Sequence, residues 1–374
     1  MKIPLVDLVA QQAEVADEVA VPLQQVFDRA EFIGGAAVGE FESAYGSAIG
    51  VRHCIGVANG TDALELALRA VGVGAGDEVI LPANTFIATA EAVVRIGATP
   101  VLVDVDPVHL LIDPAAVRAA VTNRTRAIVP VHLYGQVAPV EQLLDIAAEA
   151  GAVVVEDAAQ SQGATRFGRA AGSLGTVAAT SFYPGKNLGA AGDAGAVMTD
   201  NDGIATTVRL LGAHGSRVRY EHEIVGMNSR LDTIQAVILS AKLKRLGDWN
   251  ERRRRAARRY HDLLSGADLV LPRSLDGNQD VWHLYVVRIA DRDRVLSVLA
   301  DAGIAAGIHY PTPVHLTEAF ASLGLARGSF PVAEQAADEI LSLPIFPHIT
   351  PEQQEYVASV LLEAIGENRV ERAS

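Results

Sequence analysis

The sequence predicts an α/β fold with a large domain built on a mostly parallel seven-stranded sheet flanked by helices, followed by a small C-terminal α+β domain. Seven short apolar runs recur between residues 53 and 199, and helical segments separate most of them. This alternation is typical of parallel strands, whose connections must cross the sheet. Beyond about residue 231 the pattern becomes mainly helical. We therefore predict a large domain at residues 1–245 and a small domain at residues 246–374.

The elements are predicted in chain order from their hydrophobic periodicity and turn residues. An amphipathic helical region at residues 5–30 comes first. The seven strands are then expected at residues 53–58, 78–81, 100–105, 127–131, 152–156, 177–182 and 195–199. A long helix follows at residues 231–264, with Gly247 as a point where it can break. The small domain is expected to contain a strand at 283–289, a helix through Ala302, a strand ending at Ile308, and helices at 331–341 and 351–367.

The composition is that of an acidic globular protein. The 374 residues carry a net charge of −14, which argues against nucleic acid or a charged membrane surface as a general ligand. The arginine-rich tract at 252–259 is therefore interpreted as a solvated or ion-paired helix face. The single Cys54 excludes an internal disulfide, and no segment has the pattern of a signal peptide or a membrane span. We expect a cytoplasmic protein, and the ten histidines show no metal-ligand spacing.

In a parallel sheet ligands bind beyond the carboxyl ends of the strands, so the residues after each run are the candidates for a site. Gly60 and Thr61 follow the first run at the start of a helix, where free N–H groups can hold a phosphate. Simple capping by Thr61 or Asp62 is the alternative. Phe86 follows the second run, where it can stack on a flat ring or belong to the core.

Two further residues have ionisable groups in unusual places. Asp157 ends a buried strand, where an acid needs a cationic partner such as a protonated pyridine nitrogen, and Gln160 follows it closely. The alternative is that Asp157 caps a helix. Lys186 lies on a glycine-rich connection, where its amine can meet an aldehyde or can simply be solvated.

Together these residues fit the chemistry of pyridoxal 5′-phosphate, with pyridoxamine 5′-phosphate as its amine-bearing intermediate. A phosphate cradle, a stacking aromatic, a buried acid and a lysine each follow a different strand. The lysine forms an imine and serves as general base, and the acid tunes the ring. We predict Lys186 and Asp157 as the catalytic residues.

Four motifs carry a family resemblance. They are Asn-Gly-Thr-Asp-Ala-Leu at 59–64, Glu-Asp-Ala-Ala-Gln at 156–160, Ser-Phe-Tyr-Pro-Gly-Lys-Asn-Leu-Gly at 181–189 and Gly-Met-Asn-Ser-Arg-Leu-Asp at 226–232. With them the chain resembles the DegT/DnrJ-type nucleotide-sugar aminotransferases of the aspartate aminotransferase superfamily, fold type I. The similarity extends over essentially the whole chain.

The resemblance implies roles for individual residues. The residues expected to hold the cofactor are Gly60, Thr61, Phe86, Asp157, Gln160, Ser181, Lys186 and Asn228. Those expected to bind the substrate are Tyr183, Arg230, His309 and Tyr310. The resemblance also implies a homodimer with shared active sites. Asn228 would reach the cofactor phosphate of the neighbouring subunit, and His309 and Tyr310 would likewise line the neighbour's sugar pocket.

The same motifs indicate the activity. Some relatives that act as dehydratases have histidine in place of Lys186, and Gln160 resembles the group that acts on 3-keto sugars. The expected reaction transfers an amino group from L-glutamate to the C3 ketone of a nucleotide-linked keto-deoxyhexose, a dTDP- or UDP-sugar. Amination at C4 or of a cyclitol ketone is one alternative. A regulatory or sensory protein that binds the cofactor without turnover is another.

Overall fold

The protein is described here from a computed structural model that covers residues 1–373, with side chains to residue 366. Seven strands form the central sheet in the order β1-β9-β8-β5-β4-β2-β3. They are β1 (His53–Val57), β2 (Glu78–Pro82), β3 (Thr99–Val103), β4 (Thr125–Ile128), β5 (Val153–Asp157), β8 (Val177–Ser181) and β9 (Gly195–Thr199). Each overlaps its predicted range, although β4 begins two residues before the predicted run and ends three residues before the run ends. Only β9 runs antiparallel to its neighbours, β1 and β8, so the prediction of a mostly parallel sheet is confirmed.

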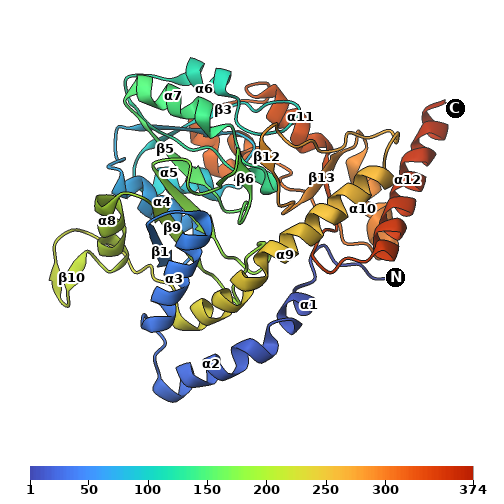
Figure 1. Ribbon diagram of the computed structural model, residues 1–374. Helices are drawn as coiled ribbons and strands as arrows, with labels where there is room; N and C mark the ends of the chain where they lie inside the picture. Colours follow the sequence, from blue (N-terminus) through green and yellow to red (C-terminus); the bar gives the residue numbers. More distant parts are fainter. Residues whose placement is uncertain (374) are drawn as a thin grey trace.

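Helices cover both faces of the sheet (Figure 1). Along β5, Val155 packs into one core cluster and Val154 into another, as expected where successive side chains point to opposite faces. The first face is covered by α4 (Gly60–Ala70), α5 (Ala88–Arg95) and α8 (Asp202–Gly212). The second is covered by α3 (Ala36–Ile49), α6 (Pro114–Ala120), α7 (Val140–Ala150) and the first half of α9 (Thr233–Leu263).

Helix α9 is continuous over 31 residues and crosses the molecule diagonally in Figure 1. It does not break at Gly247, because Leu246 and Trp249 on either side are buried and fix the helix in place. The ion-paired interpretation of the arginine tract fits most of its members. Ion pairs within the chain hold four of them, namely Arg252 with Glu14 and Asp248, Arg254 and Arg258 with Glu251, and Arg259 with Glu355. Arg253 is instead fully buried.

The C-terminal part has a core of its own, built on the antiparallel strands β13 (Tyr285–Arg288) and β14 (Ile340–Leu343). Helices α10 (Arg292–Asp301), α11 (Pro331–Glu339) and α12 (Pro351–Ala373) follow in this region. The predicted strand ending at Ile308 is wrong: only single bridges form there, from Ile304 to Ile3 and from Gly307 to Ser342. Ile3, at the other end of the chain, belongs to the same core. The domain division at residue 245 stays a prediction.

The remaining elements lie outside these two cores or are short. The N-terminal helices are α1 (Leu8–Ala13) and α2 (Ala16–Arg29), where one helical region was expected. The others are β6 (Thr165–Arg166), β7 (Arg169–Ala170), β10 (Ser216–Val218), β11 (Glu221–His222), β12 (Asn278–Gln279), η1 (Leu133–Gly135), η2 (Val314–Leu316) and η3 (Glu318–Leu323). Within the described residues, no helix combines the length and apolar character that crossing a membrane requires. Nor do three potential metal ligands gather anywhere in that part of the chain.

Candidate functional site

Two adjacent carboxylates end β5, and only one of them has its hydrogen-bonding capacity filled. Glu156 accepts from His132 Nε2 at 2.8 Å and from the backbone N–H groups of Gly172, Leu174 and Gly175. Burial opposes its ionisation, but these donors lower the pKa of Glu156. Glu156 is therefore a structural acid that fastens the loop before β8.

Asp157, the second carboxylate, accepts fewer hydrogen bonds and can still accept others. It is 5% exposed, and its Oδ2 accepts from the Thr89 hydroxyl at 2.8 Å while Oδ1 accepts from the Ala159 amide at 3.2 Å. Burial raises the pKa of Asp157, and the two donors and the Lys186 charge oppose that shift. No helix begins after it, so the capping alternative is wrong. Such a carboxylate can receive a cationic ring nitrogen.

Lys186 lies between β8 and β9, on a connection folded tightly against the sheet. Its backbone N–H donates to the Tyr183 carbonyl at 2.8 Å, and a Cβ on Gly189 would stand 2.2 Å from the Pro184 carbonyl oxygen. Burial lowers the pKa of the Lys186 ammonium to about 8, and Asp157 opposes this shift. The amine is therefore neutral near pH 7 more often than that of a solvated lysine, which favours the nucleophile over the solvated alternative.

Gln160 joins the site to the C-terminal part of the same chain. Its Nε2 donates to the Tyr310 hydroxyl at 3.1 Å, and its Oε1 accepts from the Tyr134 amide at 2.7 Å. Phe86 is 50% exposed, which excludes the core alternative, and its ring centre lies 5.2 Å from that of Tyr310. The Tyr134 hydroxyl donates to the His309 carbonyl at 2.6 Å. The expectation that His309 and Tyr310 reach the site from a neighbouring subunit is therefore wrong, since they contact Gln160 and Tyr134 of their own chain.

Gly60 and Ser181 form the second part of the site. Asn59 caps α4 by accepting the Asp62 amide at 2.8 Å, so the capping alternative for Thr61 and Asp62 is wrong. A Cβ added to Gly60 would lie 2.6 Å from Ser181 Cβ, which only glycine avoids. The free N–H groups at this helix start and the Ser181 hydroxyl lie together, as a phosphate cradle requires.

We expect Gly60→Ala to lower the affinity for pyridoxal 5′-phosphate, because the new methyl group displaces Ser181 or the helix start. A loss of about tenfold or more follows if a single phosphate hydrogen bond is lost. Gly247→Ala is the matched control, since nothing lies within 4 Å of its added Cβ in the middle of α9. Equilibrium titration of both apo variants measures the effect, and an unchanged dissociation constant for Gly60→Ala would contradict the cradle.

Three predicted residues lie apart from these contacts. Asn228 and Arg230 are exposed and line a hollow of about 400 Å³ together with Asn59 and Asp193. Tyr183 is 59% exposed on the lysine connection. None of the hydrogen bonds described for the chain joins the side chains of these three to Lys186 or Asp157. Their predicted roles stay predictions.

Sequence reasoning missed Thr89 and Tyr134. Thr89 donates to Asp157 from 68 positions away, and its own oxygen lies 2.8 Å from the Thr85 hydroxyl. Tyr134 adopts a positive φ of 63° in η1, which aims its amide at Gln160. No spacing along the chain signals either contact, although Thr89 lies only three residues after Phe86.

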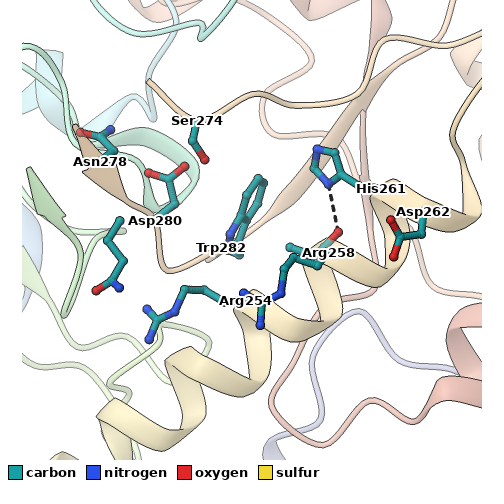
Figure 2. A pocket seen from close by; sticks show the side chains of 10 residues that line it. Arg254, Arg258, His261, Asp262, Ser274, Asn278, Asp280 and Trp282 are labelled. Carbon is teal, nitrogen blue, oxygen red and sulfur yellow. Dashed lines mark hydrogen bonds between the residues drawn. The ribbon is translucent and has the colours of Figure 1, made fainter. Parts of the chain in front are cut away.

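A different hollow, of about 450 Å³, lies beside the C-terminal half of α9 (Figure 2). Arg254, Arg258 and His261 reach it from the helix, and Asp280 and Trp282 face them from the opposite loop. None of the predicted site residues lines this hollow. The size of a hollow therefore does not identify the site in this molecule.

Comparison with known proteins agrees with this geometry. The model of the DegT/DnrJ/EryC1/StrS aminotransferase family matches residues 14–362. A pleiotropic regulatory protein of Geobacillus stearothermophilus is 47% identical over 97% of this chain and 98% of its own. The UDP-N-acetyl-3-dehydro-alpha-D-glucosamine 3-aminotransferase of Acidithiobacillus ferrooxidans is 45% identical over 96% and 97%.

Among solved structures, DesV of S. venezuelae in complex with a ketimine intermediate matches with a TM-score of 0.95. The two chains are 43% identical, and the match covers 97% of this chain and 98% of DesV. The fold and the resemblance expected from the sequence are thus confirmed. This chain belongs to the DegT/DnrJ/EryC1/StrS aminotransferase family.

Proposed function

We propose that this protein is a pyridoxal 5′-phosphate-dependent aminotransferase that aminates the C3 ketone of a nucleotide-linked sugar, a dTDP- or UDP-linked keto-deoxyhexose. The observation that carries the proposal is the pair of Lys186 and Asp157, an amine whose pKa is lowered and a buried carboxylate that forms no ion pair within the described residues. The 3-aminotransferase from Acidithiobacillus supports the position of the ketone. Aminotransferase chemistry needs both groups.

The residues of the site fit the cofactor. Among the described residues no cation forms an ion pair with Asp157, so this buried carboxylate is free to receive a pyridinium nitrogen. The close approach of Gly60 to Ser181 leaves backbone donors free for a phosphate. Phe86 presents a half-exposed ring for stacking. Gln160 keeps a second Nε2 hydrogen with which to contact the phenolic oxygen of the ring.

When bound, pyridoxal 5′-phosphate supplies an aldehyde that takes up the amino group and a ring that draws in the electron pair left by a broken C–H bond. Asp157 holds the ring nitrogen charged. The Lys186 amine, once free, takes the α-proton of the donor amino acid at its Nζ atom and later returns a proton to the sugar carbon. Burial keeps this amine partly neutral at physiological pH.

The donor is proposed from the charges of the chain, and the assembly from the family resemblance. L-Glutamate is the proposed donor, and its carboxylates need cationic contacts in a chain whose net charge is −14. Arg230, exposed beside Asn228, is the candidate contact. We propose a homodimer in which Asn228 completes the phosphate site of the neighbouring subunit.

The visible absorption spectrum of the cofactor-loaded protein tests the proposal. We expect L-glutamate to remove the band of the lysine-bound cofactor and to release one 2-oxoglutarate per site. The protein that has taken up the amino group is then mixed with a 3-keto or a 4-keto nucleotide sugar. NMR of the aminated sugar locates the new nitrogen and so identifies the acceptor carbon. A band that glutamate and other amino donors leave unchanged would contradict an aminotransferase and favour a binding protein without turnover.

A further inference from the structure

His283 is a buried histidine that the proposed reaction does not use. It lies just before β13 and is 8% exposed. Its Nδ1 atom is 3.2 Å from Oδ1 of Asn187, the residue that follows Lys186 in the chain. The ring of a histidine from the C-terminal part of the chain therefore contacts the connection that carries the lysine.

The hydrogen bonds of Asn187 determine which ring nitrogen of His283 carries the proton. Asn187 Nδ2 donates one hydrogen to Asn250 Oδ1 at 2.9 Å and the other to the Val281 carbonyl at 3.0 Å. Its Oδ1 is therefore the acceptor, and His283 Nδ1–H must be the donor. Burial, together with the Lys186 and Arg253 charges, lowers the pKa of His283 well below its usual value. His283 is held as the neutral Nδ1–H tautomer.

The backbone of His283 is held as well. Arg253, 1% exposed, donates from Nη1 to the carbonyls of Trp282 at 3.2 Å, His283 at 3.4 Å and Ile345 at 2.9 Å. The buried Arg253 guanidinium is thus held by three carbonyl oxygens, where a buried arginine usually pairs with a carboxylate. Arg253 therefore holds the backbone of Trp282 and His283, while Asn187 holds the His283 ring.

The same chain of hydrogen bonds continues to the phosphate cradle. Asn250 Nδ2 donates to the Gln162 carbonyl at 2.9 Å, and Gln162 Nε2 donates to the Ser181 carbonyl at 2.8 Å. Asn187, Asn250 and Gln162 are each at most 2% exposed. Buried amides linked in this way define a rigid arrangement, because any one left unpaired is costly.

We propose that His283 is a positioning residue for Lys186, acting through the hydrogen bond from its Nδ1–H to Asn187. This proposal rests on the proposed function of Lys186 as the cofactor-binding lysine. His283 and Asn187 hold the lysine connection against α9, so that the partly exposed Lys186 keeps its position and the lowered pKa of its amine. Contact with substrate is not part of this role.

The test measures Lys186 in the apo protein, without cofactor. Trinitrobenzenesulfonate modifies neutral amines, and mass spectrometry of the peptide containing Lys186 gives the rate at each pH. The wild-type rate should be half-maximal near pH 8. In His283→Leu, Asn187 Oδ1 loses its donor, the Lys186 amine becomes more hydrated, and the midpoint should rise by about one unit toward the ordinary lysine value. The affinity for pyridoxal 5′-phosphate should fall about tenfold.

Two further variants separate positioning from general stability. His283→Asn places an amide nitrogen where Nδ1 stood and should restore both the midpoint and the affinity. His261→Leu is the matched control, because that histidine bonds the Ala257 and Pro272 carbonyls and the Tyr285 hydroxyl but not Asn187, and its loss should leave the midpoint unchanged.

A His283→Leu protein that melts at a lower temperature but keeps the wild-type midpoint would overturn the proposal, as would failure of His283→Asn to restore it. A wild-type protein that forms no visible band with the cofactor would overturn the proposed function instead. The pH dependence of Lys186 modification would still decide the role of His283, because that measurement requires no cofactor.

Discussion

Lys186→Ala is expected to abolish the visible band of the bound cofactor and to reduce turnover at least about 10⁴-fold. The variant loses the amine that anchors the cofactor and the base that moves the α-proton, and a positioned base alone contributes roughly 10²- to 10⁴-fold. The absorption spectrum and the rate of 2-oxoglutarate release measure the two losses separately. The Lys186 side chain is only partly buried, so its removal should not unfold the protein.

Lys244→Ala is the matched control for the loss of a lysine. Lys244 lies on α9 with its side chain 64% exposed and pairs with Glu18. An exposed pair of this kind contributes little to stability, so we expect spectrum and turnover like those of the wild type. Full turnover in Lys186→Ala would show that another group performs the proton transfer.

The second large effect is expected for Asp157→Asn. The amide keeps the shape of the carboxylate but loses the charge that pairs with the ring nitrogen. Removing one partner of a buried ion pair costs about 3–5 kcal/mol, which corresponds to roughly 10²- to 10⁴-fold in rate. Single-turnover kinetics with L-glutamate measure the loss in the first half-reaction, where we expect it to be largest.

Thr89→Ser provides the comparison, because serine keeps the hydroxyl that donates to Asp157 at 2.8 Å. This variant should retain most of the wild-type rate. A normal half-reaction in Asp157→Asn would mean that the ring nitrogen works uncharged, and the assignment of Asp157 would then fail.

The seven strands could be predicted because each is a short apolar run bounded by turn residues. Every buried strand of a sheet covered on both faces must show such a run, whatever its tertiary contacts. The predicted strand ending at Ile308 was wrong because an apolar run alone does not provide a neighbouring strand. Only a single bridge forms at Gly307, so the residues have strand character without a ladder of partners.

At the site, the sequence indicated residues that chemistry makes unusual in their place. A lysine among glycines and an acid at a strand end are conspicuous without a structure. Thr89, Tyr134 and His283 are not, because each acts through a contact with a distant segment. Nor does the sequence show that Tyr310 reaches the site of its own chain, because only its hydrogen bond with Gln160 shows this.

The burial of Ile3 has a consequence for the nascent chain. Its amide donates to the Gly303 carbonyl at 3.0 Å, and its side chain belongs to a core with residues of α9, α10 and α12. During synthesis the whole seven-stranded sheet has left the ribosome before any of these partners exists. Ile3 is therefore made before the sheet and its partners after it, so this apolar side chain lacks its core until α9, α10 and α12 have been translated.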